Sequence, residues 1–347
     1  MADSVNRQWI LNERPQAKEL PTEQHLKLVE GVVPEPAEGE FLLRTICLGT
    51  SPAQRSYTSG GLLPHAPVQI GDVMRGRGVG EVIESRNPDF KPGDIVVGST
   101  GWQDYSVLSP SEDFVWSMKK VRHPVRPLTM ALGILGNAGA TAWFGLLEAA
   151  AMQSGDVVVI TAAAGGVGSV AGQIARLKGA AKVVGITGSD AKCAWLVNEL
   201  GYDAAINYHD GRVAEALAEH CPEGIDVCLD NVGGEILNAV LGNLAMHARI
   251  AIAGAISTEY ETGEVAGPLN YRNLVVHRAR MQGFVVFDYW QRFAEAEDQL
   301  YDWYQSGTLV NCEDIVEGLE KMPGALADLF SGGNCGIRSV RVSPDPD

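Results

Sequence analysis

Apolar runs alternate with segments of helical period throughout the second half of the chain. Runs rich in β-branched residues predict buried strands at 157–161, 182–187, 204–207, 225–229, 249–253 and 281–286. Helical periods lie between several of them, at 167–178, 190–200 and 234–247. This alternation is typical of a parallel sheet whose strands are joined by crossover helices. We therefore expect an α/β fold with a six-stranded, doubly wound parallel sheet.

The first third of the chain has a different pattern. Short apolar or alternating runs at 8–11, 26–29, 41–48, 79–85 and 94–98 are separated by turns rich in Pro and Gly. They predict a small, irregular β-rich barrel. From about Val125 the chain becomes richer in Ala and Gly, with longer helical periods. We therefore predict one domain over 1–125 and a second over 126–311.

The remaining segments of the chain change this picture little. An amphipathic helix is predicted at 290–305, and a strand, a short helix and a closing strand at 337–342 follow it. The uncharged run 128–147 is close to the ~20 residues that a bilayer helix needs. However, four glycines and Asn137 interrupt it, and it is not flanked on both sides by aromatic or basic residues. We predict two buried helices joined by a turn at 136–139, and no membrane span.

A glycine-rich turn follows the first strand of the predicted sheet. Aligned to the template G-x-G-x-x-G, Ala163 takes the first glycine position, Gly165 the second and Gly168 the third. Gly165 lets the backbone approach a pyrophosphate, Gly168 lets the helix close on the strand, and the helix N-terminus offers unpaired N–H groups. A glycine-rich turn without a ligand is the alternative. The alternating strands and helices that follow favour a dinucleotide site.

The end of the second strand indicates which dinucleotide the site prefers. An NAD-preferring site places Asp or Glu there, about 20 residues after the glycines, to accept a hydrogen bond from the ribose. Here Thr187-Gly188-Ser189 occupies that position, and Asp190 comes later, where it also suits a helix start. Lys192, one turn into the next helix, is placed to meet a 2′-phosphate, although a solvated helix lysine is the plain alternative. We predict NADPH.

Charge and cysteine content limit the partners and the compartment. The 347 residues carry a net charge of −16, which disfavours nonspecific binding to nucleic acid or to an anionic membrane. The six cysteines lie far apart and include no C-x-x-C pair, as expected of thiols in a reducing compartment. The N-terminal segment has no apolar core of a secretion signal. We expect a cytoplasmic protein with no nucleic-acid or membrane partner.

An ordered series of motifs along the whole chain carries a family resemblance. The chain resembles the zinc-independent medium-chain dehydrogenase/reductases, in the branch of prostaglandin reductases, leukotriene B4 dehydrogenase-like enzymes, plant double-bond reductases and bacterial curcumin reductase. The resemblance implies a GroES-like β-rich barrel, completed by the tail 312–347, plus a Rossmann domain. The motifs are NRQWILNERP, FKPGDIVVG, GWQDY, AAAGGVGSVAGQIARLKGA, GSDAKC, CPEGIDVCLDNVGG, IAGAIS, RARMQGFVVFDY and GGNCG.

The resemblance also implies a set of cofactor-binding residues. In similar proteins Lys192 and Tyr208 hold the 2′-phosphate, Asn231 lies along the cofactor, and the segments 253–257 and 284–286 flank the nicotinamide. Thr141 lies near the nicotinamide end, and Asn334 reaches back from the tail. Plain alternatives are a strand-end aromatic for Tyr208, a turn former for Asn231 and a core residue for Phe284. The full expected set is Thr141, Ala164, Gly165, Gly166, Val167, Gly168, Ser189, Lys192, Tyr208, Asn231, Ala253, Gly254, Ala255, Ile256, Ser257, Phe284, Val285, Val286 and Asn334.

The expected chemistry follows from the absence of a zinc motif. Zinc-bearing relatives carry a G-H-E motif and a cluster of four cysteines, whereas the corresponding stretch here is Arg75-Gly76-Arg77-Gly78 and the cluster is missing. We expect no metal, and therefore hydride addition to the β-carbon of an enal or enone, with hydrogen bonds stabilising charge on the carbonyl oxygen. The alternatives are a quinone oxidoreductase and a non-catalytic NADPH-binding protein.

Three departures from the family pattern concern the donor and the pocket. The expected donor, Tyr260, stands one place later than in the usual I-S-x-Y, and a loop tyrosine is the competing interpretation. The family's D-P-Y-M-R appears as Ser51-Pro52-Ala53-Gln54-Arg55, without its tyrosine, and N-x-G-K appears as Asn334-Cys335-Gly336-Ile337.

The resemblance also implies an oligomeric state. Similar proteins dimerise through the edge strand, here 281–287, so we expect a homodimer.

Overall fold

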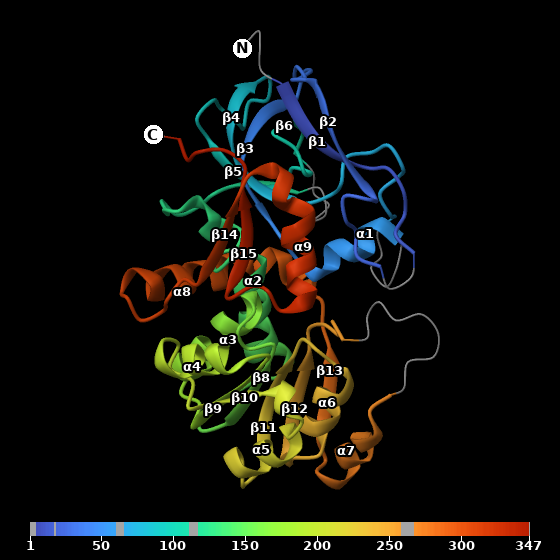
Figure 1. Ribbon diagram of the computed structural model, residues 1–347. Helices are drawn as coiled ribbons and strands as arrows, with labels where there is room; N and C mark the ends of the chain where they lie inside the picture. Colours follow the sequence, from blue (N-terminus) through green and yellow to red (C-terminus); the bar gives the residue numbers. More distant parts are fainter. Residues whose placement is uncertain (1–4, 17–18, 60–65, 111–116, 258–266, 347) are drawn as a thin grey trace. The chain divides into compact units, whose positions relative to one another are not determined.

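The computed structural model describes residues 5–16, 19–59, 66–110, 117–257 and 267–346 (Figure 1). Its contacts divide the chain into two compact units. One contains Met1–Gly133, Glu313–Asn334 and Arg338–Asp347, and the other Ile134–Cys312 and Cys335–Ile337. The domain limits expected from the sequence, 1–125 with 312–347 and 126–311, stay a prediction.

The second unit is built on a parallel six-stranded sheet in the order β10-β9-β8-β11-β12-β13. The predicted doubly wound α/β fold is therefore confirmed. Three strands have the predicted bounds, because their apolar runs end at Gly or at polar residues on both sides. The six strands are β8 Val157–Thr161, β9 Lys182–Thr187, β10 Ala204–Asn207, β11 Ile225–Asp230, β12 Leu244–Ile252 and β13 Arg280–Gly283.

Helices connect these strands and begin close to the predicted positions. The helix after the glycine turn, α3, carries its apolar residues on one face, against the sheet. The amphipathic helix predicted from residue 290 begins at Phe293, after a 3₁₀ segment. The helices of this unit are α2 Asn137–Phe144, α3 Gly166–Leu177, α4 Asp190–Asn198, α5 Val213–His220, α6 Gly234–Leu241, α7 Asn273–Val276 and α8 Phe293–Gln305.

Three predictions about this unit are wrong in detail. The strand predicted over 281–286 runs from Arg280 to Gly283, and residues 284–286 follow it outside the sheet. The helix predicted over 234–247 ends at Leu241, and β12 already begins at Leu244, since a short apolar run does not distinguish helix from strand by itself. Within 128–147, the glycines 136–139 begin helix α2 and do not join two helices. They serve close packing: a Cβ on Gly139 would collide with the Ile134 carbonyl.

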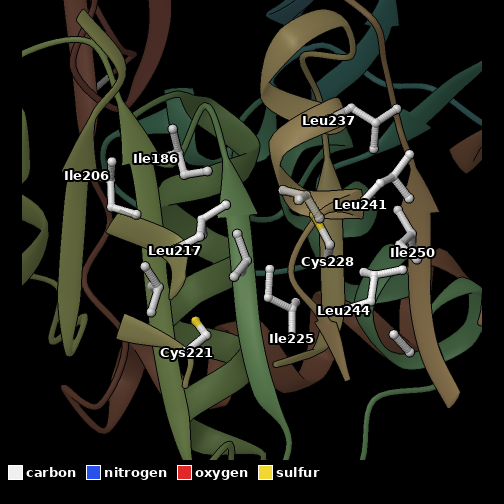
Figure 2. Close-up of a cluster of buried hydrophobic side chains, with 14 of the residues drawn as sticks. Ile186, Ile206, Leu217, Cys221, Ile225, Cys228, Leu237, Leu241, Leu244 and Ile250 are labelled. Carbon is white, nitrogen blue, oxygen red and sulfur yellow. The ribbon is translucent and has the colours of Figure 1, made fainter. Parts of the chain in front are cut away.

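A cluster of buried apolar side chains covers one face of this sheet (Figure 2). Leu217 comes from α5, Cys221 directly follows that helix, Leu237 and Leu241 come from α6, and all four are at least nine-tenths buried. They pack over strand residues such as Ile250. Burying one such side chain contributes about 1.5–3 kcal/mol, so this face fixes the two helices against β9 to β12.

The first unit is β-rich, as predicted. Its main sheet has the order β14-β15-β3-β4-β5-β7, with β6 paired to β3, and β1 pairs with β2 in a separate antiparallel ribbon. The tail strand β15 pairs antiparallel with β3, so the C-terminal segment completes this sheet. The elements are β1 Val5–Leu11, β2 Leu26–Val32, β3 Phe41–Gly49, α1 Ser56–Ser59, β4 Arg77–Ser85, β5 Ile95–Ser99, β6 Tyr105–Leu108, β7 Met118–Lys120, β14 Glu313–Glu317, α9 Met322–Ser331 and β15 Ile337–Arg341.

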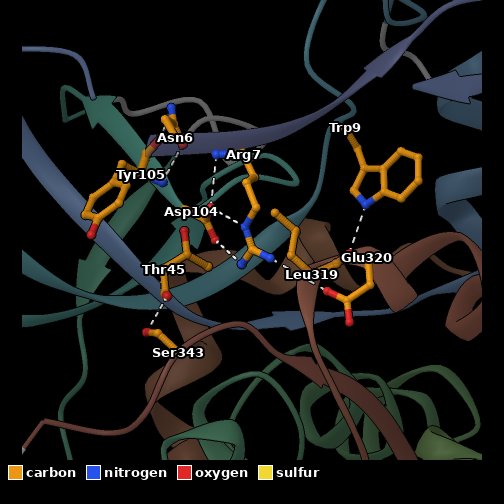
Figure 3. Close-up of polar contacts among 9 residues, drawn as sticks. All are labelled: Asn6, Arg7, Trp9, Thr45, Asp104, Tyr105, Leu319, Glu320 and Ser343. Carbon is orange, nitrogen blue, oxygen red and sulfur yellow. Dashed lines mark hydrogen bonds and ion pairs between the residues drawn. The ribbon is translucent and has the colours of Figure 1, made fainter. Parts of the chain in front are cut away.

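Polar contacts attach the β1 strand to the rest of this unit (Figure 3). The Arg7 guanidinium donates to both carboxylate oxygens of Asp104 at 2.8 and 2.9 Å. Asn6 exchanges two hydrogen bonds with the backbone of Tyr105, and Trp9 Nε1 donates to the Leu319 carbonyl at 2.9 Å. Two motifs that carried the resemblance, NRQW and GWQDY, thus contact each other.

Among the described residues, no helix is long and apolar enough to cross a membrane. The uncharged run 128–147 is divided among a 3₁₀ segment Leu128–Ala131, helix α2 and a π-helical segment Gly145–Ala149.

Gly172 tests how tightly α3 packs. Gly→Ala inside a helix normally stabilises by about 1 kcal/mol. At Gly172, however, the new Cβ would collide with the ring of buried Tyr202. We expect Gly172→Ala to destabilise the protein by about 1–3 kcal/mol in urea unfolding, since overpacking costs that much. The control is Gly324→Ala in α9, where nothing lies within 4 Å of the new Cβ. Equal effects of the two substitutions would contradict the packing argument.

Candidate functional site

The order in which the chain adds strands to the parallel sheet reverses direction between β8 and β11. From β8 the chain passes outward to β9 and β10, and then returns to β11 on the other side. In open parallel sheets, ligands bind at the carboxyl ends of the strands where the order reverses. The loops there are 162–165 after β8, 231–233 after β11 and 253–257 after β12.

The turn after β8 is tight because one of its residues is left-handed. Ala162 has a φ of 47°, and the amide of Gly165 donates back to its carbonyl at 2.9 Å. The template predicts the tight-turn position at Ala163, whereas the strained residue is Ala162, one place earlier. Alanine tolerates this conformation at a cost of about 1–2 kcal/mol.

Helix α3 offers its first amides to a ligand. Its N-cap is Gly165, which makes no side-chain capping bond, and no acidic residue lies in its first turn. The first hydrogen bond of the helix is the one that the Ser169 amide donates to the Gly165 carbonyl, at 2.9 Å. The amides of Gly166, Val167 and Gly168 have no acceptor four residues back in the helix. They therefore suit a diphosphate.

The glycines of the turn have distinct roles. A Cβ on Gly168 would lie 2.5 Å from both the Ala162 carbonyl oxygen and the Ala163 Cα, so only glycine allows α3 to approach the end of β8 this closely. A Cβ on Gly165 would meet one atom within 4 Å, the Ala162 oxygen at 3.2 Å. The space beside Gly165 is open, as the approach of a diphosphate requires.

A buried hydrogen-bond network that the motifs of the sequence do not predict joins the ends of β8 and β11. The Thr161 hydroxyl donates to Asp230 Oδ1 at 2.7 Å, and both residues are fully buried. Asp230 also accepts from the amides of Val232 and Gly233, at 3.1 and 3.0 Å. Burial raises the pKa of Asp230, and these three donors oppose the shift. The sequence does carry one signal for this network: an acidic residue, Asp230, ends an apolar strand directly before Asn-Val-Gly-Gly.

Asn231 and the segment 253–257 are held by the same network. The Asn231 amide donates to Thr161 Oγ1 at 2.8 Å, and its side-chain Nδ2 donates to the Thr161 carbonyl at 3.1 Å. The amides of Ala253 and Gly254 donate to the Asp230 carbonyl, and the amide of Ile256 to that of Asn231. The Ser257 hydroxyl donates to the Val232 carbonyl at 2.6 Å. The loops after three strands are thus fixed together.

The turn after β9 brings together the residues expected at the 2′-phosphate. Ser189 caps α4 by accepting from the Lys192 amide at 3.3 Å. Tyr208, 39% exposed, lies against this turn, since a Cβ on Gly188 would be 3.0 Å from its hydroxyl. Asn207 donates to Asp190 Oδ1 at 2.8 Å. The carboxylate of Asp190, the first acid after this strand in the chain, is therefore already bonded to a neighbouring side chain.

The remaining expected residues are more dispersed. The Thr141 hydroxyl donates to the Asn137 carbonyl within its own helix at 2.7 Å. Phe284 is half-buried and packs against Gly145 and Tyr289, and its role toward a cofactor stays a prediction. Val285 and Val286 follow it, beyond the end of β13. Tyr260 lies outside the described residues.

Asn334 is buried and directly precedes a segment that touches the glycine turn. In that segment the Gly336 amide donates to the Ala164 carbonyl at 2.8 Å, and Gly336 forms a bridge with Gly165. The role of Asn334 toward a cofactor stays a prediction.

No cluster of three or more His, Cys, Asp or Glu side chains that could hold a metal ion occurs within the described ranges. Burial raises the pKa of the Cys47 thiol to about 12, which disfavours the thiolate that a metal ligand needs.

Comparison with known proteins identifies the family. Residues 7–115 match the family model described as the N-terminal domain of oxidoreductase, and residues 166–302 match the one described as zinc-binding dehydrogenase. The NADPH-dependent curcumin reductase of Escherichia coli (strain K12) is 39% identical over 98% of each chain. The chain belongs to the zinc-independent medium-chain dehydrogenase/reductases.

Two further members of this family are similar to the chain. The 2-alkenal reductase (NADP(+)-dependent) of Nicotiana tabacum is 39% identical over 79% of this chain and 78% of its own. The crystal structure of CurA in complex with NADPH from Vibrio vulnificus superposes with a TM-score of 0.89, at 36% identity over 98% of this chain and 100% of that one. The expected family and fold are thus confirmed.

The Thr161 hydroxyl provides a test of the buried network. We expect Thr161→Val to lower the free energy of unfolding by about 1–3 kcal/mol, because it removes a donor to a buried carboxylate. Without that donor the pKa of Asp230 rises further, and a raised carboxyl pKa costs stability as the pH rises. The deficit should therefore grow as the pH is raised through the pKa of Asp230 in the folded wild type, which lies above the ordinary value of 3.8. Thr161→Ser is the control and should keep most of the stability in urea titrations. A deficit independent of pH would contradict this account of Asp230.

Proposed function

We propose that this protein reduces the C=C bond of α,β-unsaturated aldehydes and ketones with NADPH, without a metal. One observation carries the choice of cofactor: in the turn between β9 and α4, Ser189 caps the helix, Tyr208 lies against Gly188, and Asp190, the first acid after the strand, is already bonded to Asn207. The names of the curcumin and 2-alkenal reductases, both nicotinamide-dependent, support the reaction class.

The chain's own residues would hold the cofactor along the carboxyl edge of the sheet. The first amides of α3 bind the diphosphate, and Ser189, Lys192 and Tyr208 bind the 2′-phosphate. Asn231 and the loop 253–257 position the other half, because the Thr161–Asp230 network fixes both loops. The bound reduced nicotinamide supplies a hydride.

In the proposed reaction, the hydride adds to the substrate β-carbon and the electron pair of the C=C bond moves toward the carbonyl oxygen. Hydrogen-bond donors stabilise the charge on that oxygen. The α-carbon then takes a proton, which completes the saturated product. We propose the Tyr260 hydroxyl as one donor, on the family's pattern.

Two other proposals complete this function. Edge strand β13 and the neighbouring α7 expose apolar side chains, among them Val275 at 79% and Met281 at 39%, which suits a homodimer formed through this edge. Light scattering of the pure protein would decide the oligomeric state.

The second proposal concerns the compartment. All six cysteines are free thiols, which suits a reducing, cytoplasmic setting, and fractionation of cells would test this.

Product analysis tests the reaction. The purified protein is incubated with NADPH and a panel of enals, enones and quinones, and the products are identified by mass spectrometry. We expect saturated aldehydes or ketones from at least one enal or enone, and Tyr260→Phe to lower kcat by about 10²-fold or more. A hydroquinone as the sole product would establish the quinone reductase, and binding of NADPH without turnover would establish the non-catalytic alternative.

Lys192 tests the cofactor preference. A charge-assisted hydrogen bond contributes about 1.5–3 kcal/mol, so Lys192→Ala should lower the preference for NADPH over NADH by about 10- to 100-fold. Isothermal titration with each cofactor measures the ratio. Lys27→Ala, at an exposed position on β2, is the matched control. An unchanged ratio would remove Lys192 from the site.

A further inference from the structure

A hollow lined by arginines lies at the amino ends of the strands in the parallel-sheet unit. It is a shallow cavity of about 340 Å³ that is open to solvent. The lining residues include three arginines and a histidine, and none is acidic. They are Ala151, Gln153, His247, Ala248, Arg249, Arg278 and Arg280.

This cavity is separate from the candidate dinucleotide site. Ala151 and Gln153 precede β8, whereas the glycine turn follows that strand. Arg278 and Arg280 lie where β13 begins, and Arg280 pairs in register with Arg249 of β12. Because the strands are parallel, their amino ends meet at the edge opposite the carboxyl-end loops.

The positive charge of the cavity is only partly compensated. Arg249 donates to Asp156 Oδ1 at 2.7 Å and to the Ala151 carbonyl at 3.2 Å, while its Nε is buried without a partner among the described residues. Arg278 donates to the Val276 carbonyl at 3.1 Å, and Arg280 to a backbone carbonyl at 3.4 Å. These carbonyls are neutral, so two guanidinium charges lack a carboxylate in the cavity lining.

Two of these arginines are also direct neighbours. Registered residues of parallel strands point to the same face of the sheet, so the side chains of Arg249 and Arg280 share a face. Like charges at such positions destabilise a sheet. In a chain of net charge −16 this local concentration of positive charge stands out, and an anion between the guanidiniums would offset the repulsion.

The backbone around the cavity is strained. Four non-glycine residues of the described chain have a positive φ, and three of them line this cavity: Ala151 at 48°, His247 at 64° and Arg278 at 48°. The fourth, Ala162, lies in the glycine turn. Such strain costs about 1–3 kcal/mol per residue and clusters at ligand sites. The His247 amide, which donates to the His277 carbonyl at 2.7 Å, helps to hold this geometry.

We propose that this cavity binds the phosphate or diphosphate group of a small molecule, at a second site independent of the dinucleotide site. Guanidinium groups bind phosphate oxygens through paired N–H donors, and three of them converge here from two strands and the segment before β13. The mixed lining, with Ala151 and Ala248 beside the arginines, leaves room for a small organic substituent on the phosphate.

Calorimetric titration of the full-length protein with inorganic pyrophosphate, at constant ionic strength, tests the proposal. The Arg278→Gln/Arg280→Gln double variant should lose at least about tenfold in affinity at this site. Arg212→Gln, which removes an exposed arginine of the same unit from outside the cavity, is the control and should bind as the wild type does. Pyrophosphate bound at the glycine turn would contribute equally to the titrations of the wild type, the double variant and Arg212→Gln, because none of these substitutions lies at that turn.

Gln153→Glu provides a second variant that leaves the arginines intact. Gln153 is exposed at the cavity, so the substitution adds a negative charge without disturbing the core, and it should also weaken pyrophosphate binding. Thermal unfolding checks that each variant is folded. Unchanged affinity in both the double variant and Gln153→Glu, or a wild type that binds no pyrophosphate at all, would overturn the proposal.

Discussion

The candidate site depends on one buried hydrogen bond, from the Thr161 hydroxyl to the Asp230 carboxylate. It joins the carboxyl ends of β8 and β11, the neighbouring strands between which the sheet order reverses. A carboxylate in such a buried place is costly unless its oxygens are fully bonded. To meet this requirement, the amides of Val232 and Gly233 donate to the Asp230 carboxylate, and these bonds fix the loops that follow the strands.

Close approach is the second constraint on the site. Gly168 lets α3 contact the end of β8, and the left-handed Ala162 makes the turn between them short enough. Together they set where the first amides of α3 point. Their partial positive charge is the helix's own. The candidate site therefore needs few charged side chains to attract a phosphate, even in a chain of net charge −16.

The two ends of the parallel sheet handle charge differently. At the carboxyl end, backbone amides face the glycine turn and the buried carboxylate is bonded from three sides. At the amino end, guanidinium groups line a cavity and only Arg249 has a carboxylate partner among the described residues. Both regions contain left-handed alanines, which indicates that each backbone is held in place by its surroundings.

The sequence by itself determined the fold class, the glycine turn and the bounds of three of the six strands in the parallel sheet, because period, β-branched runs and glycine spacing are local signals. It also led to the family, and the contact between NRQW and GWQDY shows that part of this resemblance reflects packing. Only the tertiary structure placed Thr161 against Asp230, 69 residues apart, and Arg249 beside Arg280. It also decided that 244–247 joins a strand. These outcomes depend on which segments become neighbours in the sheet, and no local pattern encodes that.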